Sequence, residues 1–418
     1  MTSIHSMSPP TWYEIGRHGM LPEVGHDDVA RFDVIAHLNT LLAERLAPAV
    51  RASWEERAEP AFRREHGHSP RDRREAGVAL RGDPAWRSWS LVRRNTMEYR
   101  QHAGRLLALR QANELRDKAR RYSSHSPYLR LDPKLPIPRY VSEVDTHLMP
   151  GGYAAEAIDG DVSNAASYDA GLYATLGGVG GPMNDAAGRA LVAWLRRHAP
   201  NFRPRRIVDL GCGLGHNTLP LREAFPEAQI IAIDVSAPFL RYGHARANAL
   251  GYTDVEFRQE DATQTTIGAG TCDLVYTTMV LHETSHDALR KILREARRLL
   301  APGGLTIHLE QPPFRQFDAY EQFMRDWDGR YNNEPFWSAL HDTDLVELLN
   351  KIGFERSNVF ETRCEAPMVR RRTGADEAVA EDFGRAPCWY AIGAWQTAHG
   401  NVVNEGEHGH GHTPAERG

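Results

Sequence analysis

Residues 206–218 read RIVDLGCGLGHNT, and this segment is the clearest indication of the fold. An apolar run ends in Asp209 and leads into three glycines, Gly211, Gly213 and Gly215. Glycines at this spacing let the backbone turn sharply at the carboxyl end of a strand and approach a ligand where a Cβ would collide. The pattern therefore predicts that a nucleotide-like ligand binds at this edge of a parallel sheet.

Two other nucleotide-binding loops are disfavoured by the same residues. A dinucleotide fingerprint requires GxGxxG, but His216 and Thr218 stand where the third glycine would fall in the two possible registers. A P-loop requires Gly-Lys-Ser/Thr, which does not follow the glycines. The loop therefore indicates neither a nicotinamide cofactor nor a nucleoside triphosphate.

The string DLGCGLG resembles motif I of the class I S-adenosylmethionine-dependent methyltransferases. Two later segments follow in the family's order, QIIAIDVS (residues 229–236) and VEFRQEDA (residues 255–262). The resemblance implies that Asp234 binds both ribose hydroxyls, a task that suits the two oxygens of a carboxylate, and that Asp261 reads the adenine amino group. It implies S-adenosylmethionine as cofactor, with the following binding residues: Asp209, Gly211, Gly213, Gly215, Asp234, Val235, Asp261 and Ala262.

Alternating strand and helix patterns continue almost to residue 397 and favour an α/β domain over residues 185–398. CDLVYTTMVLHE, residues 272–283, resembles motif IV of the family, and FERSNVFETR and CWYAIGAWQ close the succession. The resemblance implies a Rossmann-like, seven-stranded, mostly parallel sheet with an antiparallel C-terminal hairpin.

Residues 1–125 are expected to form a helical N-terminal extension. Apolar residues recur at helical spacing from Asp28 to Val50, with Asp27 or Asp28 as N-cap, and a second helical region extends from about Trp86 to Tyr122. This second region is Arg-rich. Its arginines suit a solvated or inter-subunit face, including a homodimer interface, and an RNA or protein docking surface remains an alternative.

Prolines and then glycines dominate residues 126–184, which are expected to form a linker and an irregular, lid-like segment. Residues 399–418 contain the string HGHGH. This polar segment is expected to be a disordered tail in preference to a metal site.

The 418 residues are 41% hydrophobic and carry a net charge of -5, which is typical of a globular protein with two domains. No secretory signal is readable in the first 25 residues, and no run approaches the ~20 apolar residues of a membrane span. The four cysteines form no CxxC pair and no zinc-site spacing. We expect a cytoplasmic protein with no metal, no membrane association and no bias toward nucleic acid.

His282 directly follows the motif IV strand and is the candidate general base, because its ordinary pKa of about 6.5 suits proton transfer near neutral pH. Glu283 is expected to orient it or act beside it. The segment VLHETSHDALRKIL resembles small-molecule O-methyltransferases, in which a His followed by an acid is the base. A structural role for the pair, capping the next helix or closing the cofactor pocket, is the alternative.

Aromatic residues crowd the insertion at residues 312–341, which roofs the acceptor pocket in the family. Trp327, Tyr331 and Trp337 are the candidate acceptor contacts there, with Tyr153 contributing from the lid; core packing is the alternative. An aromatic or otherwise apolar acceptor would fit these side chains.

The sequence thus predicts an S-adenosylmethionine-dependent methyltransferase of a small molecule, similar to enzymes of ubiquinone, menaquinone and secondary-metabolite biosynthesis. Oxygen is the expected acceptor atom, with nitrogen and carbon left open. TTMVLH stands where base N-methyltransferases carry their Asn/Asp-Pro-Pro-Tyr/Phe signature, so nucleic acid is disfavoured. An RNA or protein acceptor and a non-catalytic binding protein are the alternatives.

Overall fold

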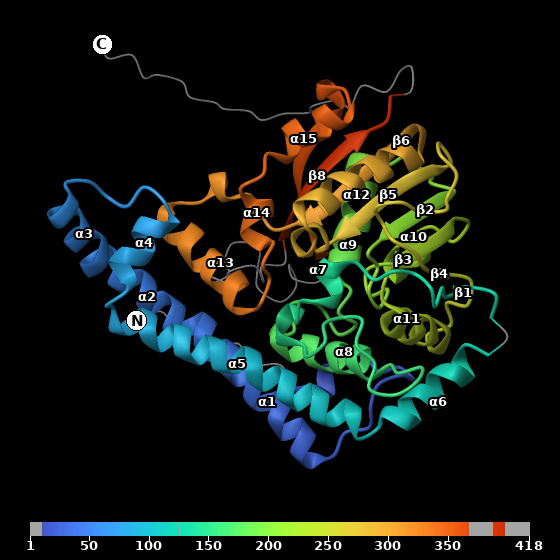
Figure 1. Ribbon diagram of the computed structural model, residues 1–418, viewed down its shortest axis with the longest axis horizontal. Helices are drawn as coiled ribbons and strands as arrows, with labels where there is room; N and C mark the ends of the chain where they lie inside the picture. Colours follow the sequence, from blue (N-terminus) through green and yellow to red (C-terminus); the bar gives the residue numbers. More distant parts are fainter. Residues whose placement is uncertain (1–10, 125, 368–387, 398–418) are drawn as a thin grey trace, which may run out of the picture.

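The computed structural model describes residues 11–124, 126–367 and 388–397. A sheet forms one end of the molecule, and long helices from the N-terminal part of the chain extend away from it (Figure 1). The strands are β1 (Leu129–Arg130), β2 (Arg206–Leu210), β3 (Gln229–Asp234), β4 (Glu256–Gln259), β5 (Cys272–Thr278), β6 (Leu300–Glu310), β7 (Val359–Glu365) and β8 (Cys388–Trp395).

Most of the remaining described chain is helical. The α-helices are α1 (His26–Leu41), α2 (Ala47–Ser53), α3 (Glu59–His66), α4 (Arg73–Leu80), α5 (Pro84–Leu109), α6 (Ala112–Tyr122), α7 (Arg139–Ser142), α8 (Ser163–Thr175), α9 (Ala186–His198), α10 (Leu219–Ala224), α11 (Ala237–Ala249), α12 (His286–Leu299), α13 (Ala319–Tyr331), α14 (Trp337–His341) and α15 (Leu345–Ile352).

The sheet has the order β1-β4-β3-β2-β5-β6-β8-β7. β8 runs antiparallel to both β6 and β7, and every other pair is parallel. The predicted mostly parallel sheet with a C-terminal hairpin is confirmed. The expected number of seven strands is too low by one, because Leu129 and Arg130 pair with Phe257 and Arg258 of β4 at the edge of the sheet.

Strand order reverses between β2 and β5. From β2 the chain adds β3 and β4 on one side, whereas β5 and β6 lie on the other. In such sheets the crevice outside the carboxyl ends of the two central strands binds ligands. The glycine loop after β2 and the motif IV segment after β5 therefore meet at this crevice.

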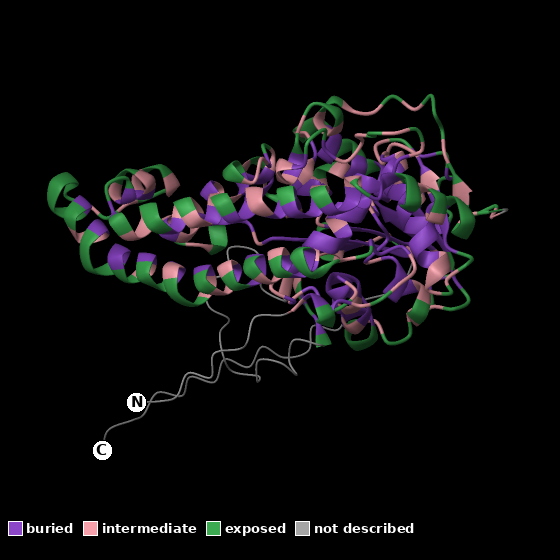
Figure 2. Ribbon diagram, turned by 90° about the horizontal axis from the view of Figure 1, so that it is seen from below, coloured by how far each residue is buried: buried purple, intermediate pink, exposed green. Residues whose placement is uncertain are grey.

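Successive residues of each central strand face opposite layers of helices, as the pleat of a strand requires. Ile207 packs into a core with α9, α10 and α11, whereas Val208 packs into a core with α12 and α15. In Figure 2 buried residues gather around the sheet, and exposed residues follow the outer faces of the N-terminal helices. The sheet thus holds the loops at its carboxyl edge from both sides.

The N-terminal extension is helical, as expected. Helix α1 begins after the N-cap Gly25, and neither Asp27 nor Asp28 takes that position, because the Asp28 carboxylate accepts a hydrogen bond from Gly25 N (2.9 Å). Helices α3 and α4 lie at the end of the molecule farthest from the sheet (Figure 1).

The segment expected to be irregular contains a buried helix, α8, which packs against α1, α5 and α11. Small residues let it pack closely: a Cβ on Gly104 of α5 would lie 2.6 Å from Ser167 Oγ of α8. A helix surrounded by protein on all sides lacks the amphipathic pattern that marks a surface helix. This is why the sequence pattern did not indicate α8.

Several arginines of the extension form ion pairs within the chain. Arg93 donates to both carboxylate oxygens of Asp328 (2.6 and 2.8 Å), and Arg73 donates to both of Asp342 (2.9 and 2.7 Å). Asp328 lies in α13, within the aromatic insertion. For Arg93, the expectation of a solvated or inter-subunit face is therefore wrong, because it attaches α5 to the insertion.

Among the described residues, none of the helices is both long enough and apolar enough to cross a membrane. The tail at residues 399–418, with its HGHGH string, lies outside the described part of the chain.

Candidate active site

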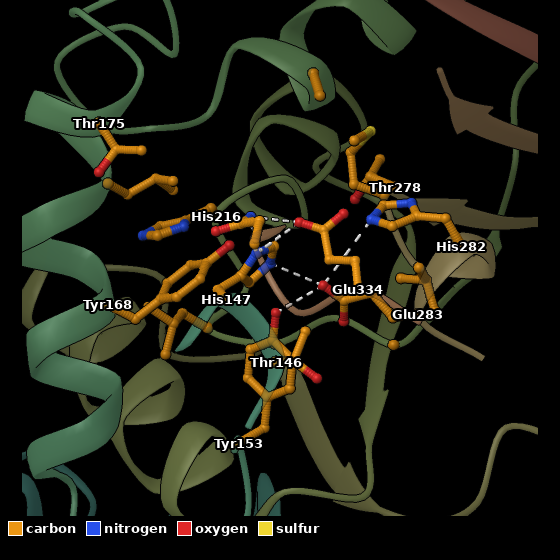
Figure 3. A pocket seen from close by; sticks show the side chains of 18 of the residues that line it. Thr146, His147, Tyr153, Tyr168, Thr175, His216, Thr278, His282, Glu283 and Glu334 are labelled. Atoms are coloured by element: carbon orange, nitrogen blue, oxygen red, sulfur yellow. Dashed lines mark hydrogen bonds and ion pairs between the residues drawn. The ribbon is translucent and has the colours of Figure 1, made fainter. Parts of the chain in front are cut away.

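One cavity of about 340 Å³ lies where the sheet, the segment of residues 126–184 and the N-terminal helices meet. Its wall includes the glycine loop after β2 and the segment after β5. The opposite wall comes from α1, α5 and α8 (Figure 3 shows part of the lining). Segments from both the N-terminal part and the α/β domain therefore enclose one space.

The glycine loop approaches this cavity in a conformation that favours glycine. Gly211 and Gly213 have φ of 79° and 54°, in the left-handed region that other residues rarely adopt. A Cβ on Gly211 would lie 2.7 Å from Val280, whereas nothing lies within 4 Å of the Cβ position of Gly213. The loop thus packs against Val280, which follows β5, at Gly211 and leaves space for a ligand at Gly213.

Asp234 ends β3 beside this loop. Its carboxylate accepts hydrogen bonds from Gly213 N (2.9 Å) and Ser236 N (2.8 Å), one on each oxygen. Burial raises its pKa to about 6, so it is mostly ionised above neutral pH. Each oxygen keeps a free lone pair for a ligand hydroxyl. These residues therefore fit the ribose of S-adenosylmethionine.

The structure brings five of the eight expected cofactor residues to the cavity wall and leaves three away from it. On the wall are Gly211, Gly213, Asp234, Val235 and Ala262.

The other three have structural partners. Asp209 lies beneath the loop, where its Oδ2 accepts hydrogen bonds from Thr218 Oγ1 (2.6 Å) and Tyr276 OH (2.9 Å). Gly215 packs against Phe257, and the Asp261 carboxylate accepts the Thr263 N–H (2.8 Å). These three residues are not on the cavity wall, and their assignment as cofactor-binding residues stays a prediction. Burial raises the pKa of Asp209 to about 7.

His282 is buried on the cavity wall. Its Nδ1 lies 2.7 Å from Glu310 Oε2, and the other Glu310 oxygen accepts hydrogen bonds from the backbone N–H groups of Val280 and Leu281. Burial acts to lower the pKa of His282, but Glu310 outweighs it and raises the pKa to about 9. Trp337 packs edge-on against the imidazole, with ring centroids 4.8 Å apart.

Glu283 faces the same cavity and contacts Tyr153 and His147 of the segment between the N-terminal helices and the α/β domain. Its Oε1 accepts a hydrogen bond from Tyr153 OH (2.8 Å) and lies 2.9 Å from His147 Nε2. The second ring nitrogen of His147, Nδ1, lies 2.9 Å from Glu334 Oε1. A histidine thus bridges two carboxylates, and all four side chains lie together in Figure 3.

The backbone of His147 is unusual. Its φ is 56°, in the left-handed region that costs free energy for residues other than glycine. Gln101 of α5 donates a hydrogen bond to the His147 carbonyl (2.6 Å) and helps to hold this conformation. Burial acts to lower the pKa of His147, but Glu334 and Glu283 raise it to about 9. The imidazole is therefore protonated at neutral pH.

Two of the four expected acceptor contacts, Tyr153 and Trp337, lie on the cavity wall. Trp327 does not, because it packs between Trp89 of α5 and Tyr331, with ring centroids 4.9 and 4.5 Å away. Tyr331 itself is 43% exposed. For Trp327 the alternative of core packing holds, since the N-terminal helices cover that side of the insertion.

A buried hub joins the N-terminal segment to the glycine loop. The Asp169 carboxylate of α8 lies 3.0 Å from His18 Nε2 and 2.7 Å from His216 Nε2, and it accepts a hydrogen bond from Tyr242 OH (2.8 Å). Burial acts to raise the pKa of Asp169, but the two histidines hold it well below its usual range. His216 directly follows Gly215, so the hub fixes the end of the glycine loop.

The sequence did not identify Arg100, His147, Glu310 and Glu334 as site residues. Three of them come from segments far from the glycine loop and motif IV, and none belongs to a recognisable motif. Glu310 offered the one usable signal, because it ends the strand beside β5 and so lies at the same edge of the sheet. Among the described residues, no group of His, Cys, Asp or Glu side chains is arranged to hold a metal ion.

A parallel sheet with this strand reversal, a glycine loop and an acid at the end of the next strand define a class I S-adenosylmethionine-dependent methyltransferase domain, and this chain contains one. Residues 207–304 match the family model described as a methyltransferase domain.

Curated relatives match part of the chain. An uncharacterized methyltransferase of Synechocystis sp. is 32% identical over 153 residues, which are 36% of this chain and 66% of that protein. The demethylmenaquinone methyltransferase of Thermus thermophilus is 36% identical over 123 residues, 29% of this chain and 54% of that protein. The chain thus spans between half and two thirds of the length of these relatives.

Solved structures also align. Phosphoethanolamine N-methyltransferase 2 of Haemonchus contortus in complex with S-adenosyl-L-methionine gives a TM-score of 0.37 at 16% identity, covering 50% of this chain and 52% of that chain.

Proposed function

We propose that this protein transfers a methyl group from S-adenosylmethionine to an oxygen of a small-molecule acceptor. One observation carries the proposal: His282 and the ribose-binding candidate Asp234 line the same cavity. When bound, the cofactor supplies an electrophilic methyl group on a positively charged sulfur. The protein then needs to place a nucleophile in line with that group and to remove its proton.

His282 is placed to accept this proton. Glu310 fixes the neutral imidazole in one tautomer, with the hydrogen on Nδ1, because only that nitrogen lies within hydrogen-bond distance of the carboxylate. Nε2 then carries the lone pair. When Nε2 takes the acceptor's proton, the imidazolium is stabilised by the buried negative charge of Glu310.

Aromatic side chains shape the acceptor side of the cavity. Tyr153, Tyr168 and Trp337 line it together with His147 and His282. Flat, apolar walls exclude water and favour an aromatic or similarly apolar acceptor. The intramolecular ion pairs of Arg73 and Arg93 give part of the Arg-rich surface a partner within the chain, which supports a small-molecule acceptor over RNA or protein.

Calorimetric titration with S-adenosylhomocysteine tests the cofactor site. We expect saturable binding that Asp234→Ala weakens by about 1.5 to 3 kcal/mol, the scale of a hydrogen bond to a charged group. Asp287→Ala, which removes the same charge from the exposed start of α12, is the control and leaves binding unchanged. Incubation with S-adenosylmethionine and a panel of phenols, followed by mass spectrometry, then tests methyl transfer. Absence of cofactor binding in the wild-type protein would refute the proposal.

A further inference from the structure

Arg100 of α5 differs from the other arginines around the site. Its side chain is 7% exposed and lines the cavity. The hydrocarbon stem lies across Gly171 of α8, where a Cβ would be 3.4 Å from Arg100 Cγ. Among the described residues, the guanidinium has a single hydrogen bond, from its NH2 group to the His147 carbonyl at 3.5 Å. Arg93, two helical turns away, instead pairs with both oxygens of Asp328.

Within the described ranges, no carboxylate lies within ion-pair distance of the Arg100 guanidinium. A buried charge without a partner is costly, because the protein interior does not replace its hydration. A guanidinium presents five donors in a planar fork whose geometry matches the two oxygens of a carboxylate. Arg100 therefore offers the cavity an anion-binding group.

The position of Arg100 relative to the candidate base follows from a chain of contacts. The guanidinium meets the His147 carbonyl, His147 Nε2 lies 2.9 Å from Glu283 Oε1, and this oxygen lies 4.0 Å from His282 Nε2. Arg100 and His282 thus line one cavity and are linked through His147 and Glu283. The cavity wall also includes apolar side chains of α1, α5 and α8, namely Ile35, Met97 and Leu172.

We propose that the methyl acceptor carries a carboxylate that pairs with Arg100, joined by an apolar body to the oxygen that faces His282. This inference rests on the proposed methyl transfer and adds the substrate class to it. The carboxylate anchors the acceptor through two parallel N–H···O bonds. Arg100 then acts as a specificity-determining residue, and the N-terminal helix α5 takes part in acceptor selection.

The two carboxylates on the opposite side of His147 define the competing occupant. Glu283 and Glu334 both contact the protonated His147 between them. The positive charge of this imidazole offsets one of the two negative charges. Glu334 Oε2 has no hydrogen-bond partner. An amine acceptor would bind near this oxygen and avoid Arg100, so carboxylate and amine probes distinguish the two substrate classes.

Binding of three matched probes tests the inference: benzoate, its neutral amide benzamide, and benzylamine. Each is titrated into the full chain saturated with S-adenosylhomocysteine. We expect benzoate to bind at least about tenfold more tightly than benzamide. Arg100→Gln is expected to abolish this preference, Arg100→Lys to retain part of it because the charge remains, and Arg87→Gln, an exposed position of the same helix, to leave it unchanged.

Three results would overturn the inference. The first is that the wild-type protein binds benzoate and benzamide with equal affinity, or binds neither. The second is that it binds benzylamine more tightly than benzoate. The third result is a benzoate preference that stays unchanged in Arg100→Gln. Binding of S-adenosylhomocysteine to each variant shows that it is folded. It also separates the two proposals, because a protein that binds the cofactor analogue but not benzoate keeps the methyltransferase proposal and loses the carboxylate acceptor. If Arg100→Gln does not fold, Arg100→Lys must show a reduced benzoate preference, and an unchanged preference refutes the inference.

Discussion

His147 Nε2 lies 2.9 Å from Glu283 Oε1, although the two residues belong to different parts of the chain. Glu283 follows β5 of the methyltransferase domain, and His147 belongs to the segment between the N-terminal helices and that domain. The ion pair closes the cavity between them. The candidate active site is therefore built from the N-terminal part of the chain as well as the α/β domain, and its electrostatics depend on residues outside that domain.

Replacing His282 is expected to remove the general base. His282→Ala lowers kcat by about 10²- to 10⁴-fold, the usual contribution of a positioned acid or base. Because only the neutral imidazole accepts a proton and the pKa of His282 is raised to about 9, kcat/KM of the wild-type protein rises with pH and levels off above about 9. The measurement is a pH profile with an identified acceptor.

Glu310→Gln provides the matched test of this profile. Removing the negative charge that raises the pKa of His282 moves the inflection to lower pH, toward the ordinary 6.5. A profile that is flat between pH 7 and 10, or an inflection that stays in place in Glu310→Gln, contradicts the base assignment and leaves His282 with a structural role.

His147→Gln is expected to destabilise the protein, because Glu283 and Glu334 lose the cation between them. Breaking a buried ion pair by removing one partner costs about 3 kcal/mol. The pKa of His147 is raised from 6.5 to about 9 in the folded protein. Its contribution is therefore fully present below pH 6.5 and is lost as the pH rises through about 9.

Chemical denaturation at pH 6.5 and pH 9 measures this effect. The free energy of unfolding of the wild-type protein falls between the two values, and the fall is smaller in His147→Gln; His282 supplies the remainder in the same direction. Equal falls in the two proteins would contradict the ionic role of His147.

Trp337 and Tyr331 distinguish cavity lining from surface. Trp337 is 8% exposed and packs against His282, whereas Tyr331 is 43% exposed and lies away from the cavity. Trp337→Leu is expected to raise KM for the acceptor about tenfold, since it removes aromatic contact area. Tyr331→Leu is the control and leaves KM within twofold, roughly the effect of a surface substitution. Steady-state kinetics with one acceptor decide between the two, and an equal response of both variants refutes the assignment.

Asp169→Asn is expected to lower the free energy of unfolding by about 3 kcal/mol, because Arg246 loses its buried counter-charge and His18 and His216 lose the carboxylate that contacts their Nε2 atoms. The pKa of Asp169 is held well below its usual 3.8 in the folded protein. Its contribution is thus present above pH 3.8 and disappears as the pH falls further. Asp159→Asn, a fully exposed position in the same segment, is the control. Equal unfolding midpoints of the two variants would contradict the proposed hub.

The sequence was sufficient for the parts of the fold that depend on local pattern. The strand that ends in Asp209, the glycines after it and the strand that ends in Asp234 carry a periodicity and a turn chemistry that can be read without a structure. The terminal hairpin was likewise predicted correctly.

The remainder depends on tertiary contacts that leave no local pattern. Helix α8 is buried all around, and strand β1 comprises only Leu129 and Arg130, which are held by β4. The His147 bridge joins residues more than a hundred positions apart. Trp327 and Trp337 stand ten residues apart in the same aromatic insertion, but Trp327 packs against Trp89 of α5 whereas Trp337 lines the cavity.

The two walls of the cavity are under different constraints. The wall that contains the proposed methyl-donor site is built from turns at the edge of the sheet, where a Cβ on Gly211 would collide with Val280. The wall on α5 and α8 consists of side chains on regular helices, which tolerate exchange without a change of backbone. The proposed donor site and the proposed acceptor site can thus be altered separately. A library restricted to the cavity-facing positions of α5 and α8 is the direct route to variants that methylate other molecules.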